Sequence, residues 1–518
     1  QVQASKFSGL TPGLFGRRSV HCFHLSRTYL HAEMNQQKKD APLLREVIEN
    51  VGFGFGQIRL ILTGCTIWIA DGSELLLLSS VTRALTVEWN MDVWQRSVIL
   101  SVVFIGVFIG NLLSGLVGDR YGRRLPILIS FGGVFVFSLM SALSQNFQAI
   151  ICTRIMVGAS FGIGQPSCFS LAGEISPSYY RIHMMALLMS LFHVGELYSA
   201  FLIWMDDPTL QTLHWRWLVC MGAMPSAVFL AIAIPLLTES PSFLLVKGRE
   251  AEAREVVHEL FKANGCLDAT VDFQPPPVQN KGQETSTLKV VFGMRLLYST
   301  LVVCFSIFTL NFLFYGGLYA FPQVLPHMKL HVSPAASLMF SSVAGLVGIL
   351  IGTILGMYFP RKACMVIYLF LVAGFTMTFT TAASDQLVPE LLDAGEPFQI
   401  RPVSGLSETL LLIGLMGMKV TIAIGFQMVT LYAAEIYPTV ARATGLAIST
   451  ACGRLGAILC PAVFEQLSHA TGGHTRFFHV MVGLCFVNAL LVLFLPFETR
   501  GQLLQDHEEE GEPIVKSA

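Results

Sequence analysis

The chain has 518 residues, of which 53% are hydrophobic and only 13% charged, whereas an ordinary soluble protein carries about a quarter charged residues. This composition excludes a water-soluble globular protein. It predicts an all-α membrane protein, because lipid offers no partners to backbone N–H and C=O groups. The formal net charge of -1 gives no reason to expect a nucleic-acid partner.

Enzyme chemistry is not expected either. The sequence contains no G-x-x-x-x-G-K-[ST] phosphate loop and no H-E-x-x-H zinc motif, so we expect no enzyme, no cofactor and no metal site. The eleven Cys form no C-x-x-C pair, and we interpret them as small apolar residues.

The N-terminal segment 1–56 is expected to be a flexible cytosolic tail. Residues 1–32 contain Arg and several Ser but no Asp or Glu, and transit peptides have the same composition. We favour the tail over the transit peptide.

Twelve apolar stretches follow, each near the length of about 20 residues that crosses about 30 Å of hydrocarbon. The longest polar connection, 238–296, separates six spans from six, and its Pro-rich part 274–286 is typical of a flexible linker. The pattern predicts six-helix bundles at 57–237 and 297–497, an inter-bundle linker at 238–296 and a cytosolic tail at 498–518. The predicted spans are 60–82, 97–117, 125–144, 149–172, 185–205, 216–237, 297–320, 335–358, 363–383, 409–432, 443–464 and 476–497.

Charge in the loops predicts the orientation. Lys and Arg gather on the side of the linker, whereas the opposite loops, 205–209 and 385–396, are acidic. Because cytosolic loops carry the excess of positive charge, we expect the linker and both termini to lie in the cytosol.

One pattern occurs twice, at the cytosolic ends of the fourth and tenth spans. The stretches 174–181 and 435–442 share E-I-x-P-x-x-x-R, and a second echo follows the sixth and twelfth spans as E-S-P (239–241) and E-T-R (498–500). Internal duplication is typical of a transporter built from two related halves.

The loop after the second span, GLVGDRYGRR (115–124), points to a particular family. It resembles the signature loop of the major facilitator superfamily, G-x-x-x-D-R-x-G-R-R, and the similarity covers about 60–500. The resemblance implies twelve transmembrane helices in two pseudo-symmetric six-helix bundles, transport by alternating access, and a monomer.

Three further stretches point to a branch of that superfamily. Residues 69–80, 310–323 and 442–463 are similar to synaptic-vesicle-protein-two-related transporters, bacterial niacin permeases and aromatic-acid/proton symporters. Animal organic-ion transporters share the last stretch, but they carry a long glycosylated loop after the first span. This chain has a short loop there and no N-x-[ST] sequon, which favours the vesicle-protein and aromatic-acid branch.

The resemblance implies that the charges at the cytosolic helix ends form ion pairs that hold the two halves together on the cytosolic side when the cavity opens outward. The stretch 352–362 of the second half has Gly356 where the first half has Asp119, and Pro360 where it has Arg123, so only the first half is expected to keep the full set. The alternative is ordinary surface pairs, each worth about 0–1 kcal/mol. The predicted cytosolic gate comprises Asp119, Arg120, Arg123, Arg124, Glu174, Arg181, Glu239, Glu435, Arg442 and Glu498.

Acids inside the spans are candidates for proton coupling. Asp71 and Glu74 lie three residues apart in the first span and so share a helical face. Because two neighbouring carboxylates do not both ionise readily, and a charge at the bilayer centre costs at least about 2.5 kcal/mol, we predict that one of them binds the coupled proton. The alternative is a polar group that bonds a neighbouring helix without titrating. Glu196, one turn after His193, is a second candidate.

Bases inside the spans are candidates for binding an anion. Lys419 and Arg454 fall well within the tenth and eleventh spans, and the planar fork of Arg suits a carboxylate. Arg454 aligns with an arginine of the organic-anion branch of the animal transporters. Alternatively, Arg454 neutralises Asp71, Glu74 or Glu196 across the bundles, and the substrate is neutral or cationic.

Aromatic and amide side chains complete the predicted binding site, where they line a cavity and stack on a planar substrate. Packing between helices or contact with lipid is the alternative for these residues. The predicted substrate-binding residues are Arg454, Asn311, Tyr315, Tyr319, Glu196, Lys419, Gln165 and Tyr198.

These features predict a secondary active transporter of a small organic solute, specifically a proton-coupled symporter of an organic monocarboxylate such as an aromatic or pyridine carboxylic acid. A facilitator of an organic cation or sugar is one alternative. A vesicle receptor or scaffold that keeps the fold without transport is another, although a scaffold has no need of charges buried in the membrane.

Overall fold

The computed structural model describes residues 42–265, 273, 289–328, 330–384, 405–438, 441–496 and 498–499. Twelve helical segments in these ranges are long and apolar enough to cross a membrane, which confirms the twelve predicted spans. The predicted acidic loop 385–396, the Pro-rich stretch 274–286 and most of the two predicted tails lie outside the described residues.

The first six spans pack together as the N-terminal bundle. The first span is broken once, at Thr66, between α3 and α4. Polar residues fix several helix starts: Asp92 accepts a hydrogen bond from the backbone N of Gln95 (2.7 Å) and Asn146 from that of Ala149 (2.9 Å). The helices are α3 (Phe55–Cys65), α4 (Ile67–Trp89), α5 (Val93–Tyr121), α6 (Arg124–Ala142), α7 (Phe147–Ile175), α8 (Arg181–Asp206) and α9 (Trp215–Leu236).

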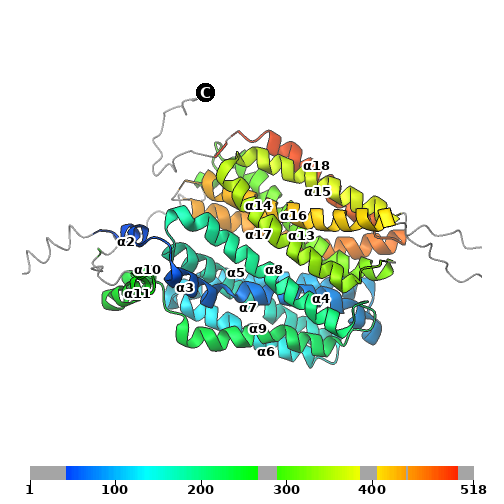
Figure 1. Ribbon diagram of the computed structural model, residues 1–518, viewed down its shortest axis with the longest axis horizontal. Helices are drawn as coiled ribbons and strands as arrows, with labels where there is room; N and C mark the ends of the chain where they lie inside the picture. The colour runs from blue at the N-terminus through cyan, green and yellow to red at the C-terminus, as the bar shows by residue number, and fades with distance from the viewer. Residues whose placement is uncertain are drawn as a thin grey trace, which may run out of the picture.

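The last six spans form the C-terminal bundle, which lies beside the N-terminal bundle with its helices running in the same general direction (Figure 1). The bundles meet where α8 packs on α14, α5 on α17 and α4 on α13. The helices are α13 (Leu297–Val324) with η3 (Leu325–His327), α14 (Pro334–Tyr358), α15 (Arg361–Ser384), α16 (Gly405–Ile436), α17 (Arg442–Thr471) and α18 (Thr475–Leu493).

Glycines bring α4 and α8 into backbone contact. A Cβ atom on Gly72 would lie 2.1 Å from the carbonyl oxygen of Phe192, and one on Gly195 would lie 2.0 Å from that of Ile69. Small residues at such a crossing let membrane helices approach closely. Asp71 precedes Gly72, and Glu196 follows Gly195. The crossing of α4 and α8 therefore places both acids near the middle of the molecule.

Three shorter helices form a cap at one end of the bundles: α2 (Leu44–Val51), α10 (Pro241–Val246) and α11 (Glu250–Ala263) (Figure 1). The cap is tied to the first span, since the Asn264 side chain accepts from the backbone N of Gly56 (2.8 Å) and donates to Gln57 (2.8 Å). Its apolar core is Leu44, Val47, Ile48, Leu244, Leu245, Ala253, Val257, Phe261 and Phe273.

The cap corrects part of the expected domain organisation. Residues 44–51 fall in the predicted flexible tail and residues 241–263 in the predicted linker, yet both are helical and share a core. Below, the end of the bundles that carries these helices is called the cap face, and the opposite end is called the far face.

Candidate functional site

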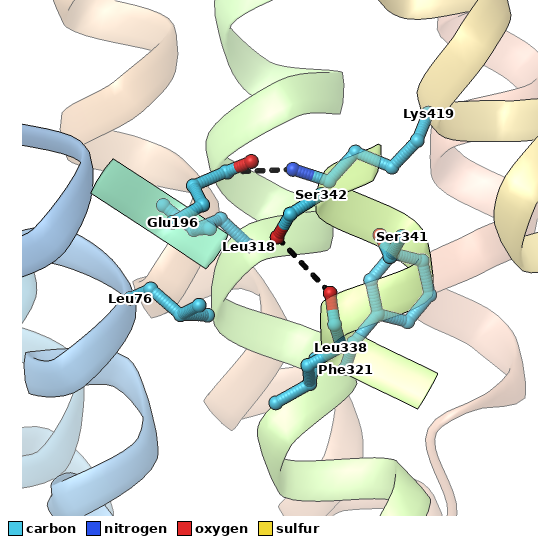
Figure 2. Close-up of a pocket in the computed structure, with 8 residues that line it drawn as sticks. All are labelled: Leu76, Glu196, Leu318, Phe321, Leu338, Ser341, Ser342 and Lys419. Carbon is cyan, nitrogen blue, oxygen red and sulfur yellow. Dashed lines mark hydrogen bonds and ion pairs between the residues drawn. The ribbon is translucent and has the colours of Figure 1, made fainter. Parts of the chain in front are cut away.

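An ion pair joins the two bundles near the middle of the spans. The Lys419 ammonium on α16 lies 2.7 Å from the Glu196 carboxylate on α8, and both side chains are buried (Figure 2). The other oxygen of Glu196 is 2.7 Å from Nδ1 of His193, one turn earlier on α8. The structure thus brings together three of the residues that the sequence singled out.

Aromatic rings surround this pair. The Lys419 ammonium lies 4.6 Å from the centre of the Phe314 ring, a cation–π contact. Phe314 in turn packs against Phe192 and Phe426, with ring centres 5.4 and 5.2 Å away. The ammonium is therefore held by one carboxylate and the face of one ring.

A small cavity opens beside the pair (Figure 2). Glu196 and Lys419 line it together with Ser341 and Ser342 of α14, and Leu318 forms part of its apolar wall. The space open to the centre of a water molecule is about 10 Å³, which is room for about one water. An organic solute enters this place only if side chains or helices move.

A second polar chain also crosses between the bundles. The Gln165 amide on α7 donates to Asp71 (2.9 Å) and accepts from Arg454 on α17 (3.0 Å), whose other terminal nitrogen lies 3.4 Å from the Tyr315 hydroxyl. Arg454 therefore reaches Asp71 through a neutral amide. Arg454 is thus linked to an acid of the other bundle, as in the predicted alternative. It does not form an unoccupied site for an anion in this arrangement.

Glu74 has a partner of its own. It forms a 2.6 Å ion pair with Arg154 of α7, and the two side chains are 3% and 1% exposed. Both residues belong to the N-terminal bundle, so the pair does not cross the interface. The two neighbouring carboxylates thus have different partners, Gln165 for Asp71 and Arg154 for Glu74, and the predicted proton coupling stays a prediction.

Contacts between the bundles continue towards the far face. Arg96 of α5 forms a 3.0 Å ion pair with Glu465 of α17, and the Tyr319 hydroxyl donates to the same carboxylate (2.6 Å). The Gln323 amide donates to the carbonyl oxygen of Ser79 (2.7 Å). These contacts close the far face. Tyr319, predicted to bind substrate, donates to Glu465 within the C-terminal bundle.

The charged motif of the first half forms a cluster at the cap face. Arg123 forms a 3.4 Å ion pair with Glu174, and its backbone N donates to Glu239 (2.7 Å). The Ser240 hydroxyl also donates to Glu174. Asp119 joins only from the surface, 3.4 Å from Arg123 and 80% exposed.

The second half repeats this cluster with Arg361 in the place of Arg123. Arg361 pairs with Glu435 (3.1 Å), its backbone N donates to Glu498 (2.8 Å), and Thr499 donates to Glu435 (2.6 Å). Its guanidinium also donates to the carbonyl oxygen of Gly356 (2.6 Å).

The expectation that only the first half keeps the full set was therefore wrong for Arg123, whose counterpart is Arg361, but right for Asp119, whose place is taken by Met357. It placed Pro360 opposite Arg123 by counting from the first glycine of each stretch, but 352–362 has one residue more than 115–124. In the structure, Gly356 corresponds to Gly118, and the basic residue follows one position later.

That these charges hold the two halves together when the cavity opens outward stays a prediction. The ion pairs of Arg123 and Arg361 lie within one bundle each rather than between the two. The remaining predicted gate residues lie at the same cap-face ends: Arg120 contacts the Tyr121 ring, Arg124 donates to the carbonyl oxygen of Ile234, and Arg181 and Arg442 begin α8 and α17.

Two other predicted binding residues are engaged locally. Asn311 donates to the carbonyl oxygen of Ile307 on its own helix (2.8 Å), and the Tyr198 hydroxyl donates to that of Met221 (2.9 Å). Arg96 and Glu465 were missed, because each lies at the end of a span, where a charge is ordinary.

Comparisons with known proteins place this architecture. Residues 72–510 match the model of the family described as "Sugar (and other) transporter". The chain is 29% identical over 509 residues to the organic cation/carnitine transporter 7 of Arabidopsis thaliana, covering 89% of this chain and 95% of that protein. It is 25% identical over 516 residues to the synaptic vesicle 2-related protein of Xenopus laevis, covering 94% of this chain and 87% of that protein.

Among solved structures, the xylose transporter XylE from E. coli in an inward-open conformation matches with a TM-score of 0.67. The two sequences are 18% identical, and the match covers 86% of this chain and 98% of XylE. This likeness concerns the fold alone.

Proposed function

Because the chain belongs to the sugar (and other) transporter family of the major facilitator superfamily, in its synaptic vesicle 2-related branch, we propose that it is a secondary active transporter of a small organic solute that carries a carboxylate. The bundles rock about the central site, which is exposed to each side of the membrane in turn. We further propose that the cap face is cytosolic, on the bias of Lys and Arg towards that face.

The observation that carries this proposal is the placement of charge at the middle of the interface. Asp71 and Glu196 belong to the N-terminal bundle, whereas Lys419 and Arg454 belong to the C-terminal bundle. Charges at this depth are rare in membrane helices and are retained where they face a pathway or a partner. Contacts that cross the interface have to break when the bundles separate, so these groups become available to a solute in each cycle.

Asp71 is the proposed site of the coupled proton. Its assigned hydrogen-bond partner is the neutral amide of Gln165, whereas Glu74 is neutralised by Arg154 within the same bundle. Arg454 loses its indirect link to Asp71 when the bundles part, which disfavours the charged carboxylate and favours uptake of a proton. The freed guanidinium then offers its fork to the carboxylate of the solute.

An organic cation is the second candidate substrate. The Lys419 ammonium already occupies a place between Glu196 and the Phe314 ring, which is chemistry that holds cations. The Arabidopsis relative is named as an organic cation/carnitine transporter, and this supports the same alternative.

Uptake into proteoliposomes tests the proposal. A panel of radiolabelled carboxylates, amines and sugars is offered with and without an inward proton gradient. We expect the gradient to stimulate uptake of a carboxylate, and Asp71→Asn to abolish the stimulation while exchange of solute across the membrane continues. If the proton gradient does not change the uptake of any solute, the proton coupling is refuted. If no solute is taken up, secondary transport is refuted.

A further inference from the structure

Two histidines lie where the bundles meet at the far face, and they carry an inference that concerns the motion of the bundles rather than the solute. We propose that His327 and His474 form an acid-sensitive latch, which keeps the far face closed while both rings are neutral and lets it open when they take up protons. The inference rests on the rocking motion of the proposed function. It makes opening depend on the acidity of the compartment at the far face.

The two rings belong to the C-terminal bundle and lie next to each other. His327 ends η3, and His474 immediately precedes α18. Their ring centres are 6.3 Å apart. Phe464 of α17 stacks on the His474 ring at 5.2 Å, and the Ser468 hydroxyl lies 3.0 Å from its Nδ1. Because a hydroxyl both donates and accepts, Ser468 holds the ring in place whether or not it is protonated.

Two arginines of the N-terminal bundle face these histidines across the interface. The charge of Arg96 on α5 acts on His474, and that of Arg83 on α4 acts on His327. Arg96 pairs with Glu465, whereas Nη1 of Arg83 is buried and has no hydrogen-bond partner among the described residues. With neutral rings, the two arginines and Glu465 leave one positive charge in excess. Protons added to the histidines therefore meet a region that is already positive.

Other titratable groups lie nearby. Glu465 bridges the bundles here as well, and Arg96 and Tyr319 bind its two oxygens. Its own response to acid is separated from that of the histidines by the variants described below. Charges at exposed positions interact weakly, since water and salt screen them. The exposed titratable groups at these helix ends are Asp92, His469, Arg476 and His479.

Closure of the far face makes protonation of His474 unfavourable. Burial, together with the charges of His327 and Arg96, lowers the pKa of His474 from 6.5 to about 4. In the open state water reaches the ring, and we expect its pKa to return to about 6.5. The closed state then holds fewer protons, so it is favoured above about pH 6.5 and loses that advantage as the pH falls towards about 4. Between about pH 7.5 and about pH 5, the ratio of open to closed states should rise about 10–30-fold.

Pulsed electron resonance on the full-length protein in lipid nanodiscs, without solute, tests the latch. Spin labels at Leu143 and Leu406, which are exposed at the far-face ends of α6 and α16, report the separation of the bundles in a cysteine-free background. We expect the ratio of the longer-distance to the shorter-distance population to rise at least about tenfold between about pH 7.5 and about pH 5.

Variants assign this response to the histidines. The double variant His327→Gln with His474→Gln should lose most of the pH dependence. His474→Lys, which is charged at neutral pH, should enlarge the longer-distance population already at about pH 7.5. His214→Gln is the matched control, because His214 pairs with Asp206 within the N-terminal bundle (2.9 Å), and it should leave the response unchanged. Equal populations at the two pH values in the unmodified protein, or an undiminished response in the double variant, overturns the latch.

Failure of the latch is distinguishable from failure of the proposed function. The response should persist in Asp71→Asn, which removes the proposed site of the coupled proton; a response that disappears there belongs to Asp71 and refutes the latch. Gradient-driven uptake of a carboxylate by a protein whose far-face distance does not depend on pH retains the proposed function and refutes the latch. A far face that opens in acid, in a protein that takes up no solute, supports the latch and refutes the proposed function.

Discussion

The ion pair between Arg96 and Glu465 holds the bundles together near the far face, and its removal should shift the balance between the states of the transporter. Arg96 lies on α5 and Glu465 on α17, 3.0 Å apart. The variant Glu465→Gln removes the charge but keeps an oxygen that accepts from Tyr319. The bond to Tyr319 lies within the C-terminal bundle, whereas the ion pair crosses the interface.

The magnitude follows from the burial of the two side chains. A hydrogen bond to a charged group contributes about 1.5–3 kcal/mol to stability. The Arg96 side chain is 33% exposed and the Glu465 side chain 4%, so water screens part of the interaction. We therefore expect a loss of about 1–2 kcal/mol, which changes the ratio of the far-face-closed to the far-face-open state about 5–30-fold.

Pulsed electron resonance measures this ratio. Spin labels at Val87 and Arg476, which are exposed at the far-face ends of different bundles, report the separation of those ends in a cysteine-free background. Glu465→Gln should enlarge the population with the longer distance, and Tyr319→Phe should not. An unchanged distribution in Glu465→Gln, or an equal shift in Tyr319→Phe, would refute the reasoning.

Three other changes have defined outcomes. Arg361→Gln should lower the melting temperature by an amount that corresponds to about 1–3 kcal/mol, and we expect the same of Arg123→Gln in the first half. An unchanged melting temperature, as for an ordinary surface residue, would contradict this. Arg454→Lys keeps the positive charge but loses the planar guanidinium that can bind a carboxylate through two hydrogen bonds. It should reduce carboxylate uptake at least about tenfold while leaving the protein folded. Burial raises the pKa of Asp207, but hydrogen bonds from Thr212, from Thr209 and from the Gln211 backbone outweigh burial and lower it from 3.8 to about 2. A depressed carboxyl pKa stabilises the fold above the unfolded value, so the melting-temperature advantage over Asp207→Asn should shrink as the pH falls from about 5 to about 2, and a constant advantage would contradict this.

The features that could be predicted from sequence are those that depend on local patterns. Apolar runs of sufficient length gave the twelve spans, because the thickness of the hydrocarbon sets the length of a helix. The fixed spacing of Glu174 and Glu435 in the repeat located two matching clusters at helix ends. The partner of Glu435 was missed, because one additional residue before Arg361 hides the equivalence with Arg123.

Other features depend on packing between distant segments. Arg96 and Glu465 lie 369 positions apart, and nothing in either local sequence indicates the other. The cap helices, by contrast, left a signal that could have been used. Ala253, Val257 and Leu260 recur at helical spacing within the polar stretch 250–263, which is the pattern of an amphipathic helix. The polar connection between the bundles therefore contains packed helices.

The buried charges fall into two classes with different consequences for transport. The pairs Glu74–Arg154 and Arg361–Glu435 lie within one bundle, so rigid-body rocking leaves them intact and they preserve the shape of each half. The contact of Lys419 with Glu196 crosses the interface, and under the proposed rocking mechanism it is broken and remade in every cycle. Only a contact of the second kind can link solute binding to the motion, because its energy differs between the states. A solute that replaces the partner lost on opening lowers the barrier to rocking, and a solute that leaves a buried charge uncompensated raises it.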